Sequence, residues 1–67
     1  MTKSIASFVY MVTDTNTGRF IIYDTKPNKV QLLDITINNL YIEEDRAKDY
    51  VNDGDIIVDK IKIHTLK

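Results

Sequence analysis

The chain has 67 residues, a formal net charge of −1, no cysteine and a hydrophobic fraction of 43%. This length accommodates one small core, and we predict a single domain over residues 1–67. The lack of cysteine excludes a disulfide framework and a thiolate metal site, and it fits a reducing, cytoplasmic location. The hydrophobic fraction is too high for a disordered tail, and no apolar run reaches the ~18 residues of a membrane span.

The first predicted elements form a β-hairpin. Ile5–Thr13 is rich in β-branched and aromatic residues, which favour a strand. It follows directly on Met1–Ser4, a start that lacks the apolar block of a signal peptide. Asp14–Gly18 supplies turn residues, and Gly18 can adopt the positive φ that closes such a loop. Arg19–Tyr23 then predicts the returning strand.

A third strand is predicted after the hairpin. Pro27 presets a turn and cannot donate to a strand ladder. The run from Val30 to Ile37 alternates, with apolar residues on one face: Leu33, Ile35 and Ile37. The alternation changes phase over residues 38–42, which fits a turn, a bulge or the start of a helix.

One helix and a last strand complete the predicted order. Glu43–Asp53 has an acidic first turn, which complements the helix dipole, and Gly54 is placed to end it. Its apolar residues have the spacing of one buried stripe: Ala47, Tyr50 and Val51. Ile56–Leu66 alternates as a strand. The predicted fold is therefore α+β, a small antiparallel sheet with one helix in the order β-β-β-α-β.

The predicted strands are apolar on both faces, which is more than one helix can cover. In the first strand, Phe8 and Val12 alternate with Val9 and Met11. A large exposed apolar patch on a soluble protein tends to mark an interface. We therefore predict self-association through the sheet, most simply as a two-fold homodimer. The alternatives are a surface reserved for another protein, a sheet that curls on itself, or lysine and arginine stems that screen the patch. The candidate interface residues are Val9, Met11, Ile21, Tyr23 and Ile57.

The chain offers little for catalysis or metal binding, and we predict no enzyme, no metal and no cofactor. His64 is the only histidine, and the sequence identifies no nucleophile or orienting partner for it. With two glycines in the chain, a phosphate-binding glycine loop is excluded. The carboxylates around Gly54 fail the EF-hand pattern, because Val51 and Lys60 fall at coordinating positions.

An acidic segment is the strongest candidate for function. Residues 43–59 carry seven carboxylates against Arg46 and Lys48, a local net of −5. At about 100° per residue, aspartates spaced four apart line one side of the predicted helix. Such a row suits a basic protein surface, and the alternative is an ordinary solvated helix face. The candidate partner-binding residues are Asp45, Asp49, Asp53 and Glu44.

Nucleic-acid binding is the alternative function. Aromatic residues on adjacent strands can form a stacking platform for single strands; here they are Phe8, Tyr10, Phe20 and Tyr23. The sequence pI of about 5.6 and the sparse basic groups make nucleic acid an unlikely partner on composition. No membrane partner is expected.

The segments Thr15–Arg19 and Glu43–Tyr50, with the order of hairpin, strand, acidic helix and last strand, resemble small accessory proteins of tailed bacteriophages. The resemblance implies an early, host-modulating protein that binds and blocks a host protein in the host cytoplasm. The leading hypothesis is therefore a non-catalytic protein-binding module, a phage-type inhibitor or modulator that self-associates through its sheet.

Overall fold

The computed structural model describes residues 4–66, with side chains over 7–64; Met1, Thr2, Lys3 and Lys67, which the sequence analysis included, lie outside this range. The strands form one antiparallel sheet of three in the order β2-β1-β3. The α+β class is confirmed, but the helix count and element order differ from the prediction. The elements in chain order are β1 (Ser4–Asp14), β2 (Phe20–Tyr23), α1 (Lys29–Asn38), α2 (Glu44–Asp53) and β3 (Ile56–Leu66).

The β1–β2 hairpin is confirmed. Gly18 has φ +79°, a left-handed value that an L side chain rarely adopts, and an added Cβ would contact nothing within 4 Å. The glycine is therefore required by its backbone angle and not by space. Asp14 organises the turn: its side chain is fully buried and accepts hydrogen bonds from the Asn16 amide and the Thr17 hydroxyl, both at 2.9 Å.

The predicted strand over Val30–Ile37 is wrong, because these residues form helix α1. Asn28 caps the helix: its side-chain oxygen accepts from the Gln31 amide at 2.8 Å, and Gln31 Oε1 accepts from the Asn28 amide at 3.0 Å. This reciprocal capping box starts a helix after Pro27. Leu32, which packs against the core, and the buried Ile35 and Thr36 have the i, i+3, i+4 spacing of one helical stripe.

Within the segment 38–42, Asn38 ends α1 and residues 39–42 belong to the turn between the two helices. The amides of Asn39 and Leu40 both donate to the Ile35 carbonyl, at 2.8 and 3.0 Å, and close the end of α1. Leu40 is 1% exposed and belongs to the core, whereas Tyr41, with φ +59°, is 78% exposed. Of the alternatives left open by the sequence, the turn is therefore the one adopted.

Helix α2 and strand β3 agree with the prediction. α2 begins one residue later than predicted, with Glu43 as its N-cap, and ends at Gly54, whose φ is +82°. Ala47 is fully buried beneath the helix, and Tyr50 and Val51 pack against the core as the predicted stripe requires. β3 spans Ile56–Leu66 and pairs with the whole length of β1.

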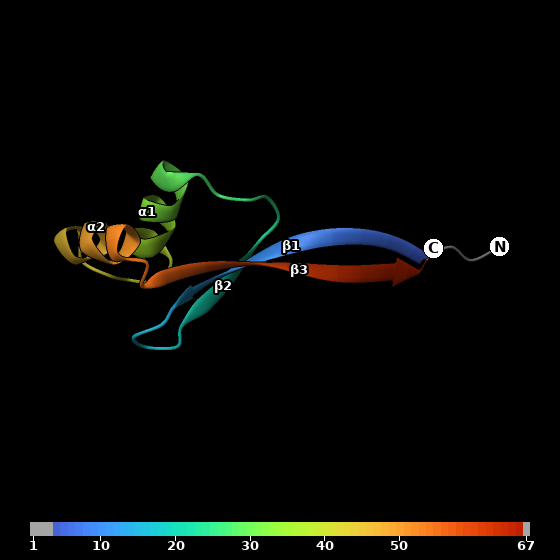
Figure 1. Ribbon diagram of the computed structural model, residues 1–67, viewed down its shortest axis with the longest axis horizontal. Coiled ribbons are helices and arrows are strands. Elements are labelled where there is room, and N and C mark those ends of the chain that lie inside the picture. Colours follow the sequence, from blue (N-terminus) through green and yellow to red (C-terminus); the bar gives the residue numbers. More distant parts are fainter. Residues whose placement is uncertain (1–3, 67) are drawn as a thin grey trace.

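Both helices cover the same face of the sheet and lie at one end of the molecule (Figure 1). The core between them and the sheet contains Val12, Ile35, Leu40 and Ile56. We call this end, with β2 and the adjoining halves of β1 and β3, the head. Strand β2 pairs only with residues 10–13 of β1, so residues 4–9 and 61–66 continue as a two-stranded ribbon, here called the arm. The molecule measures 52 × 21 × 18 Å as a result.

Candidate interaction surfaces

The sheet face opposite the helices is largely apolar, and we call it the open face. Directly paired residues on antiparallel strands share a face, and the register pairs Met11 with Ile22 and Asp59. Phe20 is 57% exposed and Ile22 is 51% exposed, although both are large and apolar. The open face consists of Val9, Met11, Thr13, Phe20, Ile22, Ile57, Asp59, Ile61 and Ile63.

The five residues predicted to form an oligomer interface do not share one face. Val9, Met11 and Ile57 belong to the open face. Ile21 and Tyr23 lie on the other side and pack against the core, so they do not share a sheet face with the other three. The alternation within β2 was visible in the sequence, but the register that matches it to β1 depends on the hairpin loop.

Four apolar residues of the open face were absent from the predicted interface: Phe20, Ile22, Ile61 and Ile63. Each directly faces or neighbours a predicted member across the ladder, as Ile61 faces Val9. Pairing β1 with β3 in the sequence analysis would have identified Ile61 and Ile63. The open face is therefore larger and more continuous than the sequence suggested.

Thr13 introduces a polar group into the open face. Among the described residues, its Oγ1 is a buried side-chain oxygen without a hydrogen-bond partner. Thr13 sits on the central strand, and its neighbours across the ladder are Phe20 and Ile57. A buried hydroxyl that makes no hydrogen bond costs free energy, so this position contributes less than an apolar residue of the same shape.

The predicted acidic row is exposed on α2. Asp45, Asp49 and Asp53 are all exposed, with the four-residue spacing that keeps them on one side of the helix. Glu44 differs from them, because its carboxylate lies 3.8 Å from the Lys48 ammonium. Both side chains of this pair are exposed, so solvent screens it and Glu44 remains part of the acidic surface.

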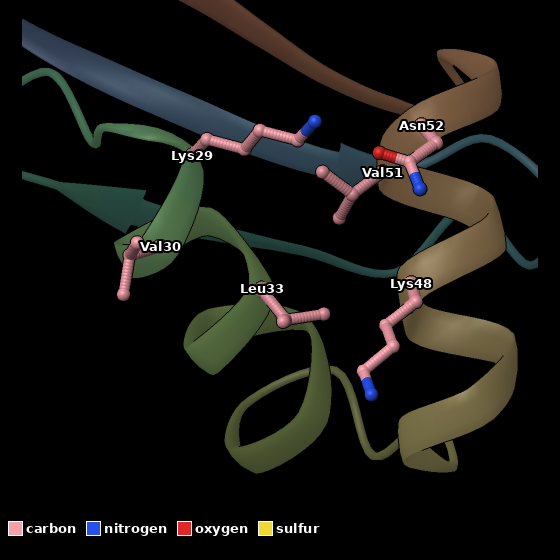
Figure 2. A pocket seen from close by; sticks show the side chains of 6 residues that line it. All are labelled: Lys29, Val30, Leu33, Lys48, Val51 and Asn52. Carbon is pink, nitrogen blue, oxygen red and sulfur yellow. The ribbon is translucent and has the colours of Figure 1, made fainter.

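A groove of about 320 Å³ separates α1 from α2 (Figure 2). Leu33 and Val51 point toward one another across it, whereas Val30 points away and is 78% exposed. Lys29 and Lys48 extend along its rim. The sequence analysis missed this groove because it assigned α1 to the sheet. A ligand in it would meet apolar walls and two cations beside the acidic row.

The four aromatic residues proposed as a stacking platform are divided between the two faces. Phe20 is on the open face, whereas Tyr23 packs against the core. Phe8 and Tyr10 lie on the side of the sheet that carries the helices, Phe8 in the arm and Tyr10 where β1 begins to pair with β2. Lys60 accompanies them, with its ammonium group 4.1 Å from the centre of the Phe8 ring.

His64 is exposed on the arm, in register with Ala6. Over residues 4–66, no three or more carboxylate and histidine side chains come together as a metal site. In the same range, neither helix has the length and apolarity needed to cross a membrane.

Comparison with known proteins found no matching family model, no matching curated protein and no matching solved structure. Functional proposals for this chain therefore rest on its own geometry.

Proposed function

We propose that this protein is a small, non-catalytic protein-binding module that acts as a dimer. The open faces of two copies pack together, and helix α2 presents its aspartates to a basic surface on another protein, which the module inhibits or modulates. The observation that carries the proposal is that both helices cover one face of the sheet while the other face is apolar and uncovered.

The exposed apolar side chains support a second copy as the occupant of the open face. Phe20, Ile22, Ile57 and Ile63 are between 39% and 57% exposed, and they lie on the same face with half-buried apolar neighbours. Burial of apolar surface stabilises by about 25 cal/mol per Å². A surface of this kind on a small soluble domain is typical of association.

The shape of the chain gives independent support. The protein exposes 4922 Å², whereas a compact monomer of 7.8 kDa exposes about 4,400 Å². Its radius of gyration is 14.1 Å, against about 11 Å for a compact chain of this length. Two-stranded ribbons are marginally stable alone in water. In the proposed dimer, the second copy packs on the arm, which has no helix of its own chain on either side (Figure 1).

The open face extends over all three strands of the sheet, so two copies can pack face to face. Association through faces is favoured over pairing of the β3 edges. Charged residues on an edge strand discourage pairing, and β3 carries Asp59, Lys60 and Lys62.

Packing of the open faces leaves α2 accessible, because α2 lies on the opposite side of the sheet. Asp45, Asp49 and Asp53 then form two equivalent acidic rows on a dimer. Complementary charge accelerates encounter with a basic partner and gives specificity more than affinity. The groove beside α2, with Leu33 and Val51 as its walls, offers an apolar anchor next to these charges.

The dimer is tested by light scattering after size-exclusion chromatography at micromolar concentration. We expect a mass near twice 7.8 kDa for wild type and a melting temperature that rises with protein concentration. Ile22→Glu should shift the mass to that of a monomer. Val30→Glu is the matched control, because Val30 is also exposed and apolar but lies on α1, outside the open face. A monomeric wild type at all concentrations contradicts the proposal.

The role of α2 is tested by pull-down from a cell lysate with wild type and the variant Asp45→Lys/Asp49→Lys/Asp53→Lys in parallel. A basic protein retained by wild type, lost from the variant and released by salt supports the proposal. The control is Asp34→Lys, on α1. Equal retention by the folded triple variant would assign the acidic row to a solvated helix face.

A further inference from the structure

Charge is segregated along the long axis of this molecule. The acidic row of α2 belongs to the head, whereas the β1–β3 ribbon is basic on one side where the head meets the arm, at Lys60 and Lys62. Within residues 7–13 and 56–64 of the two strands, the only carboxylate is that of Asp59. Asp59 belongs to the open face together with Met11. The opposite side of the same ribbon carries Lys60 and Lys62 with no carboxylate in those ranges. The formal net charge of −1 for the whole chain does not show this separation of charges.

Aromatic rings alternate with the lysines on that side. The register pairs Phe8 with Lys62 and Tyr10 with Lys60, and directly paired residues share a face. The Lys60 ammonium lies 4.1 Å from the centre of the Phe8 ring, and Phe8 remains 43% exposed. A hollow of about 200 Å³ continues the surface toward the head. Its lining consists of Tyr10, Lys26, Val58 and Lys60.

We propose that this basic aromatic face binds single-stranded nucleic acid. The rings of Phe8 and Tyr10 stack against bases. The ammonium groups that contact phosphates are those of Lys26, Lys60 and Lys62. Stacking needs unpaired bases with free π faces, and the 43% exposed ring of Phe8 is accessible to such a base. A base stacked on Phe8 replaces Lys60 over the ring, and the released ammonium group pairs with a phosphate.

Single-stranded nucleic acid explains the surface better than an acidic protein does. An acidic partner would use the ammonium groups but would have no use for an exposed aromatic ring between them. Nucleic acid uses both features, because each nucleotide has one anionic phosphate and one flat base. The basic aromatic face is on the opposite side of the ribbon from the open face, so this binding does not depend on the proposed dimer.

The test is fluorescence anisotropy with a labelled oligothymidine of about 12 nucleotides, titrated with the full chain at several salt concentrations. We expect binding whose logarithm of affinity falls with the logarithm of salt concentration, with a slope of about −2 for three lysine–phosphate contacts on a single strand. Lys60→Glu/Lys62→Glu should weaken binding about tenfold or more and remove most of the salt dependence. Phe8→Leu should weaken it by about fivefold or more, because stacking contributes about 1–3 kcal/mol per base.

Lys29→Glu/Lys48→Glu is the matched control, since it makes the same charge change in the groove between the helices. It should alter affinity less than about twofold if the binding site is local. Absence of oligothymidine binding at low salt, or equal weakening by both double variants, overturns the proposal. Equal affinity for duplex DNA also overturns it, because paired bases cannot stack on the rings. Equal affinity for polyglutamate would instead assign the face to an acidic protein.

Discussion

The head and the arm are made from the same two strands, yet they are held together differently. In the head, Val12 of β1 and Ile56 of β3 are buried against Ile35 and Leu40 of the helical layer. In the arm, the same strands pair with each other and have no helix on either side (Figure 1). The head is therefore stabilised by a hydrophobic core, whereas the arm is held together by the backbone hydrogen bonds of its two strands and has no helix on either face.

Because of this difference, the residues that stabilise the fold are mostly not the residues that are available for contact with other molecules. Long-range apolar packing stabilises the head, and its exposed side chains can be changed at small cost. The arm exposes Phe8 and Ile63 on its two sides, and a ribbon of this kind gains most from contact with something else. Variants at buried positions of the head should therefore change folding, whereas variants at exposed positions of either region should mainly change association and binding.

The largest expected effect is in the core of the head. Ile35→Ala removes a side chain that is 1% exposed, and it should lower the free energy of unfolding by about 2–5 kcal/mol through lost packing and a residual cavity. Urea denaturation followed by circular dichroism measures it. Ile63→Ala in the arm is the comparison and should cost much less in the monomer. Equal losses at the two positions would remove the distinction between head and arm.

The next effect is in the hairpin turn. Asp14→Ala deletes a buried carboxylate and leaves the Asn16 amide and the Thr17 hydroxyl without their acceptor. We expect a loss of about 1–3 kcal/mol, measured by the shift of the urea midpoint. Asp24→Ala is the control, because Asp24 is exposed and should change stability by no more than about 0.5 kcal/mol.

The capping box of α1 should contribute less. Asn28→Ala removes the acceptor of the Gln31 amide and should cost about 1 kcal/mol. Thermal unfolding checks the value, and Asn28→Asp, which keeps an N-cap acceptor, should restore most of it. If Asn28→Ala is neutral, tertiary packing and not the cap is responsible for starting α1.

A small effect of opposite sign is expected at Thr13. Thr13→Val replaces a buried hydroxyl that has no hydrogen-bond partner with a methyl group of similar shape. Stability should stay the same or rise by up to about 1 kcal/mol. Because Thr13 belongs to the open face, the dimer should also tighten, as measured by sedimentation equilibrium. A clear destabilisation would indicate that the hydroxyl has a partner in solution.

The smallest effect is expected at His64. This side chain is exposed on the arm, and His64→Ala should change stability by no more than about 0.5 kcal/mol. The variant should also retain the binding of wild type in the assays described above. Loss of partner capture without unfolding would give His64 a direct role, contrary to the prediction from sequence.

Elements governed by local interactions were predicted correctly from the sequence. Gly18 follows a run of turn residues and closes the hairpin, and the acidic first turn with Gly54 at the end defines α2. Each depends on residues within a few positions of one another. The alternation over Ile56–Leu66 predicted β3 in the same way.

Helix α1 shows where local pattern was ambiguous. Val30, Ile35 and Ile37 are β-branched, which favours a strand by composition, and Ile35 and Ile37 alternate with polar residues. The capping pair Asn28 and Gln31 was equally visible in the sequence and pointed to a helix. Burial of Ile35 beside Leu40 against the sheet decided between them, because packing energy exceeds intrinsic propensity.

The sequence by itself determined that the strands are apolar on both sides, that an acidic helix precedes β3 and that lysines alternate along β3. Tertiary structure alone decided which residues share a surface. The register put Ile22 with Met11 on the open face and Lys60 with Tyr10 on the other, and the helical layer covered only the head. The physical reason is that faces of a sheet are shared by strands distant in sequence, so a single pairing register assigns every side chain to its side.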